Sequence, residues 1–450
     1  MSNELKPLHF DADYTMEEAL AEAKRCLNCP KPLCRMGCPI ENEIPRFIQA
    51  IARGNFGEAN DILAERTNLP SICGRVCPRE NQCEGNCIMN KAKKPPINIG
   101  KLERFAADFE SINELRKPKK IKQDLGKVAV VGSGPAGLSV AGDVAKLGYE
   151  VTVFEGQSEP GGVLLFGIPE FRLSKAVVRR EIARLEGLGV KFVCNTFIGQ
   201  DKTLDDLFAE GYDSIFIGTG THIPQDVRME NDEVPGVFQA MYLLTNVQLV
   251  ENGELDENQI PVKKGDRVII IGGGNVAMDA ARTCVRLGCE AVTVAYRRSQ
   301  EQMPALLSEY EEARAEGVQF QWFASPVGVE GTDKVEGFKY EVMALNEDGA
   351  GIHGTGNFQV MPVDKIIIAA GHKPNARLVG EGNNLKVDEK GYIITSEDPY
   401  GMTSRDGVFA GGDVVHKPAT VVLAMREAKK AVDGMVKYME IKKAQESANQ

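Results

Sequence analysis

The sequence contains no apolar run that could cross a membrane. No hydrophobic stretch approaches the roughly 18 residues that a transmembrane helix needs, and the start, MSNELKPLHF, has no apolar core of an export signal. Positive charge is also in deficit, because 53 Lys and Arg face 64 Asp and Glu, for a net charge of −11. A surface of this kind repels phosphate backbones. We therefore expect a cytoplasmic protein that neither enters a membrane nor binds nucleic acid.

Histidine is scarce, whereas cysteine is concentrated in one segment. The chain has five histidines and eleven cysteines, and eight of the cysteines lie between residues 26 and 87. They form two groups, C-x2-C-x4-C-x3-C followed by proline and C-x3-C-x5-C-x3-C, whose members are Cys26, Cys29, Cys34, Cys38, Cys73, Cys77, Cys83 and Cys87. Core packing alone would not concentrate thiols in this way, so the segment is interpreted as a metal-cluster site.

Three chemistries could use such a segment. A [4Fe–4S] cluster takes closely spaced thiolates from one loop, and the C-x3-C-P ending is that of bacterial ferredoxins, in which the last cysteine ligates a second cluster. By spacing alone, Cys26, Cys29 and Cys34 would serve one cluster and Cys38 another, and the second group would complete both. Zinc prefers paired C-x2-C knuckles, often with histidine, and the nearest histidine is His9. Disulfides need an oxidising compartment. Iron–sulphur clusters are therefore favoured.

The cysteine groups are embedded in helical patterns. Thr15 with a glutamate three residues later predicts a capped helix over 15–25, and apolar residues at helical spacing over 44–69 predict two short helices broken near Gly54. A further helical pattern carries Glu103, and the basic, proline-containing stretch 114–127 is typical of a linker. We expect a small helical domain over residues 1–122.

The pattern changes at Lys127 to strand, glycine turn, helix and strand. Gly132, Gly134 and Gly137 form G-x-G-x-x-G, and Glu155 ends the second strand. The first glycine permits the tight turn, the second lets the backbone approach a pyrophosphate, and the third lets the helix pack on the strand. The acid can accept hydrogen bonds from a ribose, so the segment predicts a dinucleotide site.

The same unit recurs from residue 267. Gly272 and Gly274 are present, the third glycine is Ala277, and the second strand ends in Arg297 and Arg298 instead of an acid. Guanidinium groups attract a 2′-phosphate that a carboxylate would repel. This second site is predicted to prefer NADP(H); a solvated strand end is the alternative reading of the two arginines.

Two dinucleotide sites suggest a bound flavin and a diffusible nicotinamide. The tail returns to flavin-type chemistry, with a strand, then Gly411, Gly412 and Asp413, then a helix. We therefore predict an α/β protein in which the NADP domain is inserted into the FAD domain. The first part of the FAD domain would span residues 123–222, the NADP domain residues 223–372, and the second part of the FAD domain residues 373–450. Hydride transfer to flavin needs no catalytic side chain, which fits the lack of any triad or acid–base pair.

The chain resembles the glutamate synthase small (beta) subunit family of FAD, NADPH and [4Fe–4S] oxidoreductases. Relatives of that family include the large subunit of ferredoxin:NADP transhydrogenase, sulphide dehydrogenase and the N-terminal half of dihydropyrimidine dehydrogenase. The resemblance covers about residues 12–440 and is carried by the motifs RCLNC, LPSICGRVCP, CEGNC, INIGKLERF, GSGPAG, EPGGVLLFGIPEFRL, GGGNVAMD, YRRS and AGGD. It implies non-covalent FAD, NADP(H) and two [4Fe–4S] clusters.

The resemblance also implies site residues. It assigns one cluster to Cys26, Cys29, Cys34 and Cys87, and the other to Cys38, Cys77, Cys83 and Glu103. This conflicts with counting by spacing, which makes Cys73 the eighth ligand; the resemblance leaves Cys73 spare. The positions that match FAD contacts are Gly132, Ser133, Gly134, Pro135, Ala136, Gly137, Glu155, Gly161, Gly162, Arg172, Gly412 and Asp413. The positions that match NADP contacts are Gly272, Gly274, Asn275, Val276, Arg297 and Arg298.

The expected function is to take hydride from NADPH onto FAD and to relay single electrons through the clusters to a partner. The favoured partner is the large subunit of glutamate synthase. The alternative is the small flavoprotein subunit of an electron-bifurcating transhydrogenase, or ferredoxin, because both systems use the same cofactor set. An alternative of another class is a redox-sensing or scaffold module, which predicts damaged glycine fingerprints, and both fingerprints are intact.

Overall fold

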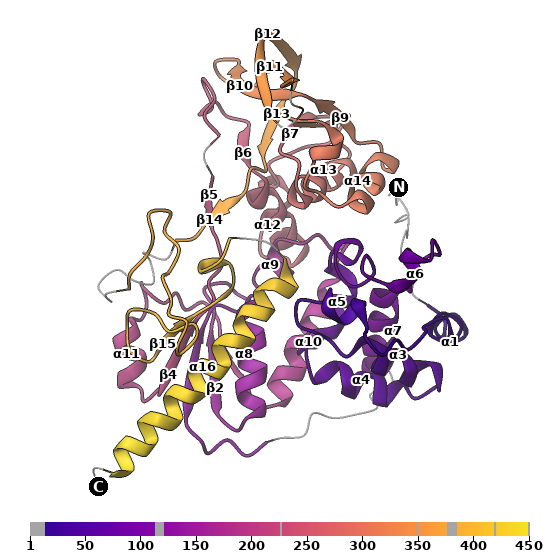
Figure 1. The fold of residues 1–450 in the computed structure, drawn as a ribbon. Coiled ribbons are helices and arrows are strands. Elements are labelled where there is room, and N and C mark those ends of the chain that lie inside the picture. The colour runs from indigo at the N-terminus through magenta and orange to yellow at the C-terminus, as the bar shows by residue number, and fades with distance from the viewer. Residues whose placement is uncertain are drawn as a thin grey trace. The chain divides into compact units, whose positions relative to one another are not determined.

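The computed structural model describes residues 14–112, 121–225, 227–347, 349, 351–375, 385–417 and 420–448. The chain divides into two compact units (Figure 1). We call Phe166–Phe171 with Pro224–His372 the inserted unit, and Asp11–Leu165, Arg172–Ile223 and Lys373–Gln450 the larger unit. None of the described helices combines the length and apolar character needed to cross a membrane.

The larger unit begins with a helical region that holds the cysteines. Its helices are α1 (Met16–Lys24), α2 (Leu33–Met36), α3 (Ile44–Ala52), α4 (Phe56–Ala64), α5 (Pro70–Val76), η1 (Arg79–Asn81), α6 (Ile88–Lys91) and α7 (Ile99–Ile112). The predicted capping box is present at Thr15, and Gly54 separates α3 from α4 with a φ of +76°. Phe47, Ile51 and Leu102 are fully buried between these helices, so short helices share one apolar core.

The rest of the larger unit is a parallel sheet covered by helices. Its strand order is β15-β4-β1-β2-β3. The strands are β1 (Lys127–Val131), β2 (Glu150–Phe154), β3 (Lys191–Val193), β4 (Ser214–Ile217) and β15 (Val408–Ala410), with helices α8 (Pro135–Lys146), α9 (Val163–Phe166), α10 (Lys175–Gly187), α11 (Leu204–Ala209), η4 (Gly412–Val414) and α16 (Val421–Ala448). The helix α16 lies beside α8. Because β15 from the tail pairs with β4, the predicted insertion is confirmed.

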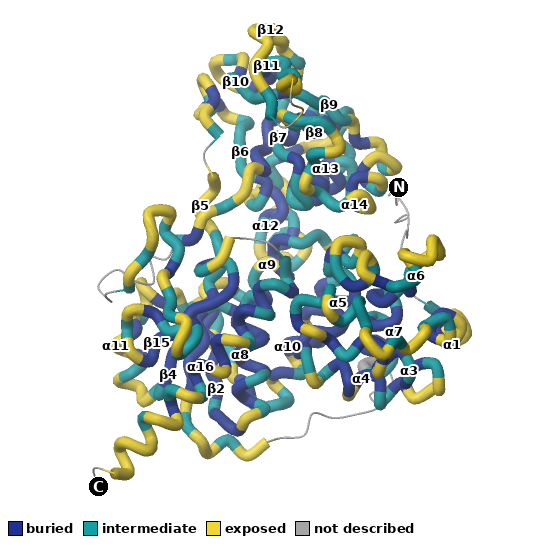
Figure 2. Tube along the Cα trace, viewed as in Figure 1, coloured by how far each residue is buried: buried dark blue, intermediate teal, exposed yellow. Residues whose placement is uncertain are grey.

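The inserted unit repeats the pattern with a second parallel sheet, in the order β6-β13-β7-β8-β9. Its parallel strands are β6 (Val237–Gln239), β7 (Arg267–Ile271), β8 (Ala291–Tyr296), β9 (Gln319–Trp322) and β13 (Lys365–Ile368), and its helices are α12 (Ala240–Glu251), η2 (Glu257–Gln259), α13 (Asn275–Arg286), η3 (Gln300–Gln302) and α14 (Leu307–Ala315). The two-residue strands β5 (Ile223–Pro224) and β14 (His372–Lys373) mark the places where the chain passes between the units. The burial pattern in Figure 2 follows the sheets, whose central strands are buried.

The inserted unit also contains an antiparallel sheet that the sequence analysis did not predict. It consists of β10 (Ala324–Glu330), β11 (Gly337–Leu345) and β12 (Ile352–Pro362). Nearly every residue of β12 is exposed, so the strand lacks the alternation of apolar and polar residues by which a half-buried strand is recognised.

Candidate cofactor sites

The glycine turn of the larger unit has the geometry of a dinucleotide site. Gly132 has a φ of +93°, and a Cβ there would lie 2.8 Å from the carbonyl oxygen of Gly218. Gly134 caps α8 and would direct a side chain into open space, whereas a Cβ on Gly137 would lie 2.0 Å from the carbonyl oxygen of Gly132. The turn, the open approach and the close helix–strand contact are therefore all present. Pro135 and Ala136 form the first turn of α8, and its N-terminus faces this opening.

Glu155 is held at the end of β2 beside this turn. Its carboxylate accepts hydrogen bonds from the backbone N–H of Ser133 at 3.0 Å and of Gln157 at 2.9 Å. The Ser133 hydroxyl also donates to Glu155, and it accepts from the backbone N–H of Gly161 at 2.8 Å. The fully buried Ser133 therefore links the acid, the glycine turn and the following loop.

Two further glycine segments approach the same turn. Gly162 has a φ of +52°, and a Cβ there would lie 2.9 Å from the Cα of Gly134. Gly412 has a φ of +75°, and its Cβ would lie 2.8 Å from the Cβ of Ala136, while Asp413 follows in η4. Arg172 lies between α9 and α10 and is partly buried. Backbone with no side chain thus surrounds the N-terminus of α8, which fits the pyrophosphate of FAD.

The glycine turn of the inserted unit is built in the same way. A Cβ on Gly272, whose φ is +145°, would lie 2.5 Å from the carbonyl oxygen of Ala369, and Gly274 caps α13 facing open space. Asn275 begins α13, and its side-chain oxygen accepts from the backbone N–H of Leu306 at 3.0 Å. Ala277, at the third glycine position, is fully buried. Ala277 therefore places a methyl group where the other turn has its third glycine. Gly274 still faces open space at the N-terminus of α13.

Gly273, a further residue of this turn, was not predicted as a site residue from the sequence. A Cβ on Gly273 would lie 2.6 Å from the ring of Tyr296, which ends β8. The run of three glycines was the only available signal. Val276, by contrast, lies partly buried on α13 against the core of the inserted unit.

The two arginines after β8 are free to bind an anion. Arg297 is exposed and Arg298 partly exposed. Within the described residues, no ion pair involves either guanidinium group, whereas Arg267 in the same unit is paired with Asp364 at 2.9 Å. Unpaired guanidinium groups at the end of the second strand fit a 2′-phosphate.

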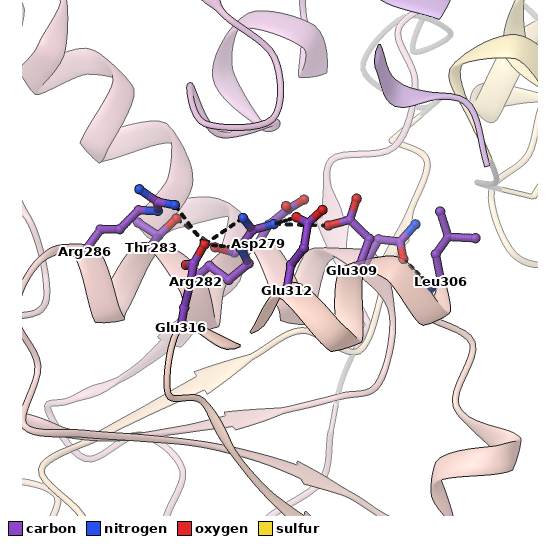
Figure 3. Close-up of polar contacts among 9 residues, drawn as sticks. Asp279, Arg282, Thr283, Arg286, Leu306, Glu309, Glu312 and Glu316 are labelled. Carbon is purple, nitrogen blue, oxygen red and sulfur yellow. Dashed lines mark hydrogen bonds and ion pairs between the residues drawn. The ribbon is translucent and has the colours of Figure 1, made fainter. Parts of the chain in front are cut away.

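The helix α13 is anchored by a buried cluster of charges (Figure 3). The Arg282 side chain is 3 % exposed and contacts Glu312 at 2.6 Å and Glu316 at 2.8 Å. Glu312 lies in α14, and Glu316 is the C-cap residue of that helix. Arg286 shares Glu316 at 2.8 Å. The guanidinium groups of Arg282 and Arg286 lie 4.4 and 4.3 Å from the ring centre of Phe171. These contacts fix the helix that presents Gly274 and Asn275, and they hold the segment 166–171 in the inserted unit.

Four cysteines line one pocket in the helical region. Cys26, Cys29, Cys34 and Cys87 line the pocket together with apolar side chains. Burial raises the pKa of Cys26 and raises that of Cys34 to about 12. Free thiols in this environment are protonated at neutral pH, so a metal must displace protons to bind them. Four thiols that line one pocket together with apolar side chains fit the ligand set of a [4Fe–4S] cluster.

The remaining predicted ligands gather around Glu103 on α7. Its carboxylate interacts electrostatically with Cys38, Cys77 and Cys83. Burial raises the pKa of Glu103 to about 8, and the Asn42 amide donates to it at 3.4 Å. No sequence signal indicated Asn42, which comes from the loop before α3.

Cys73 also lies at this second group. Its thiol forms a hydrogen bond with Cys77, which together with burial raises the pKa of Cys77, and it is 3.7 Å from the sulphur of Met425 on α16. Both Cys73 and Glu103 are thus adjacent to Cys77, and the choice of the eighth ligand remains a prediction. Among the residues that the structure describes, no group of three or more His, Cys, Asp and Glu side chains is placed closely enough to hold a single metal ion.

Two known families match this chain, one in its cysteine-containing helical region and the other in the region of the two dinucleotide turns. Residues 6–115 match the family described as dihydropyrimidine dehydrogenase domain II, 4Fe–4S cluster, and residues 126–428 match the pyridine nucleotide-disulphide oxidoreductases. Among solved structures, FprA from Mycobacterium tuberculosis in complex with NADPH is 19 % identical with a TM-score of 0.58 over 72 % of this chain and 86 % of FprA. Thioredoxin reductase of T. acidophilum is 21 % identical with a TM-score of 0.52 over 70 % and 97 %. These two structures share the fold.

Two curated relatives align with this chain over nearly their whole length. The glutamate synthase [NADPH] small chain of Escherichia coli (strain K12) is 37 % identical over 94 % of this chain and 92 % of the relative. The NAD-dependent dihydropyrimidine dehydrogenase subunit PreT of the same strain is 34 % identical over 95 % of this chain and 96 % of PreT. The cofactors are FAD, NAD(P)H and [4Fe–4S] clusters. The chain therefore belongs to the family of glutamate synthase small chains, the NAD(P)H-dependent iron–sulphur flavoprotein oxidoreductases.

Proposed function

We propose that the chain takes hydride from NADPH and delivers single electrons to a partner protein, as the small chain of a glutamate synthase. One observation carries this proposal: two dinucleotide turns and two cysteine groups occur in one chain, over the full length that it shares with glutamate synthase small chains. The bound flavin would accept the hydride pair and supply electrons singly to the clusters.

The preference for NADPH rests on Arg297 and Arg298. Relatives named for NADPH and for NAD are both similar to this chain, so similarity does not decide between the nucleotides. The two guanidinium groups have no carboxylate partner among the described residues, and a 2′-phosphate would supply the missing negative charge.

The proposed ligands form two sets. Cys26, Cys29, Cys34 and Cys87 would hold the first [4Fe–4S] cluster, and their shared pocket supports this grouping. The second cluster would take Cys38, Cys77, Cys83 and Glu103, and the interactions of Glu103 with all three thiols support this set.

The dinucleotides would be positioned by backbone and not by catalytic side chains. Glu155 would accept hydrogen bonds from the ribose of FAD, and Gly134, Gly162 and Gly412 would leave room for the pyrophosphate of FAD. The domain roles would follow: clusters in 1–122, FAD in 123–222 and 373–450, and NADP(H) in 223–372. Reduced thiolate ligands favour a cytoplasmic location.

The test is reconstitution of activity with a partner. Anaerobically purified chain should contain FAD, iron and labile sulphide, and it should oxidise NADPH with ferricyanide. With a glutamate synthase large chain, NADPH oxidation should become dependent on glutamine and 2-oxoglutarate. Exchange of electrons with ferredoxin only in the presence of a small flavoprotein subunit would instead favour the transhydrogenase. Failure to oxidise NADPH with any acceptor would favour a sensing module.

A further inference from the structure

We infer that Cys284 and Cys289 form a thiol–disulfide exchange site, whose substrate is a small-molecule disulfide of the glutathione class. The two free thiols lie in the inserted unit, outside the two cysteine groups of the helical region. Cys284 is on α13, and Cys289 lies in the turn between α13 and β8. The inference goes beyond the proposed function, because it requires neither the clusters nor a partner protein.

The end of α13 brings the two cysteines together. Leu287 caps the helix, and Gly288 follows with a φ of +83°. The backbone N–H of Gly288 donates to the carbonyl oxygen of Val285 at 3.0 Å, and the backbone N–H of Cys289 donates to that of Cys284 at 3.2 Å. These two bonds define a Schellman motif, in which the side chains at the two outer positions are frequently in apolar contact. Here both outer positions are cysteine.

The two thiols differ in burial and are joined by a hydrogen bond. Cys284 is fully buried, whereas Cys289 is partly exposed. The Cys284 thiol donates to the sulphur of Cys289. The Cys289 sulphur also lies 3.8 Å from the carbonyl oxygen of Lys263. A dissolved disulfide therefore meets Cys289 first, and Cys284 lies behind it as the second thiol.

The hydrogen bond between the thiols also favours the reactive form of the outer one. It lowers the pKa of Cys289 and raises the pKa of Cys284, although burial and the Asp266 carboxylate oppose the ionisation of Cys289. The thiolate is the nucleophile in thiol chemistry, and a lowered pKa together with access to solvent distinguishes a reactive cysteine from an inert buried one. Cys289 is therefore the attacking thiol, and Cys284 is the resolving thiol.

The reaction transfers two electrons from the protein to the small disulfide. The Cys289 thiolate attacks one sulphur of that disulfide, and the other sulphur leaves as a thiolate. Cys284 then attacks the Cys289 sulphur of the mixed disulfide, a bond forms between the two cysteines, and the second small thiolate leaves. The protons of the two cysteines pass to the two released thiolates. The product joins the last turn of α13 covalently to the turn before β8.

The experiment uses the anaerobic holoprotein and oxidised glutathione as the probe. Trypsin cleaves after Arg286, between the two cysteines, so a disulfide between them would join two peptides. After incubation, free thiols are alkylated in denaturant, and the digest is analysed by mass spectrometry with and without reductant. The variants Cys284→Ala and Cys289→Ser are compared with the wild type. Cys194, a partly buried cysteine whose pKa is raised by burial, is the internal control.

The wild type should yield the joined peptides, which reductant separates, and glutathione should modify Cys194 at least about tenfold more slowly than Cys289. Cys284→Ala should retain one glutathione on Cys289, because no second thiol resolves the mixed disulfide. Cys289→Ser should leave Cys284 free of glutathione, because that thiol is buried. The inference is wrong if the wild-type peptides stay separate in excess oxidised glutathione, or if Cys284 carries glutathione in the Cys289→Ser variant. Lack of NADPH oxidation with ferricyanide would instead refute the proposed function.

Discussion

At the scale of single residues, the second cysteine group offers two candidates for one ligand position. Burial raises the pKa of Glu103 to about 8, although the nearby charge of Arg79 opposes this shift. Cys73 is buried as well, but its thiol already contacts Cys77 and Met425. An iron atom of a cluster would bind the Glu103 carboxylate in place of a proton.

Substitution separates the candidates. Glu103→Ala should remove one cluster and lower the iron content by about four atoms per chain. Cys73→Ala should retain the iron, because the buried thiol would be lost without the loss of a ligand. Iron and labile sulphide per FAD in anaerobically prepared protein are the measurement. Loss of iron in the Cys73→Ala variant alone would show that the spacing argument was right.

The arginines after β8 are proposed to select the nucleotide, and neither guanidinium group has an ion pair within the described part of the chain. Arg297→Ala with Arg298→Ala should raise the KM for NADPH by more than about 100-fold, because two charge-assisted contacts with the 2′-phosphate are lost and each contributes about 1.5–3 kcal/mol. The KM for NADH, which lacks this phosphate, should change little. Steady-state reduction of ferricyanide with each nucleotide is the measurement. An equal rise of both KM values would mean that the arginines support the fold of the site and do not select the nucleotide.

At the scale of elements, Asp108 joins three helices of the larger unit. Its carboxylate on α7 contacts Arg75 on α5 at 2.5 Å, and it also pairs with Arg180 on α10. Burial opposes ionisation of Asp108, but the hydrogen bonds and charges of Arg75 and Arg180 outweigh it and lower its pKa. The cysteine-bearing helices are thereby tied to the helix layer of the adjacent sheet.

Asp108→Ala should destabilise the larger unit by about 3 kcal/mol, because it leaves two partly buried guanidinium groups without a partner. A depressed folded-state pKa stabilises the fold above the ordinary carboxyl value of 3.8, and this contribution is lost as the pH falls through the lowered value. The difference between variant and wild type should therefore shrink below about pH 4. Denaturant unfolding of both proteins from pH 7 down to roughly pH 2, a range that extends well below the ordinary carboxyl pKa, is the measurement. Asp398→Ala, which removes an exposed pair with Lys437, is the control and should cost little.

At the scale of the whole molecule, the C-terminal tail completes the larger unit after the inserted unit. The strand β15 is the edge strand beside β4, Gly412 approaches the first glycine turn, and α16 lies against α8. A site that depends on two chain segments far apart in sequence cannot form until both are present.

Truncation after His372 should therefore yield protein without bound flavin, because β4 loses β15, one of its two neighbouring strands, and the turn loses Gly412. Truncation after Lys442 removes only the exposed end of α16 and should leave flavin binding intact. Flavin absorbance per chain after gel filtration is the measurement. Stoichiometric flavin in the shorter protein would contradict the role given to the tail.

The sequence by itself determined the local parts of this protein. The glycine turns at Gly132 and Gly272, the break at Gly54 and the capping box at Thr15 depend on conformations that neighbouring residues impose, so spacing predicted them. The insertion was also predictable, because the chain returns to a strand and the motif AGGD after the second glycine turn.

Only the tertiary structure decided what distant segments do to one another. It linked Ser133 to Glu155, put both Glu103 and Cys73 beside Cys77, and paired Arg282 with glutamates of α14. It also produced the exposed sheet with β12, which carries no alternating pattern. The physical reason is that burial, charge pairing and strand pairing depend on residues brought together by the fold, and spacing along the chain does not specify those distances.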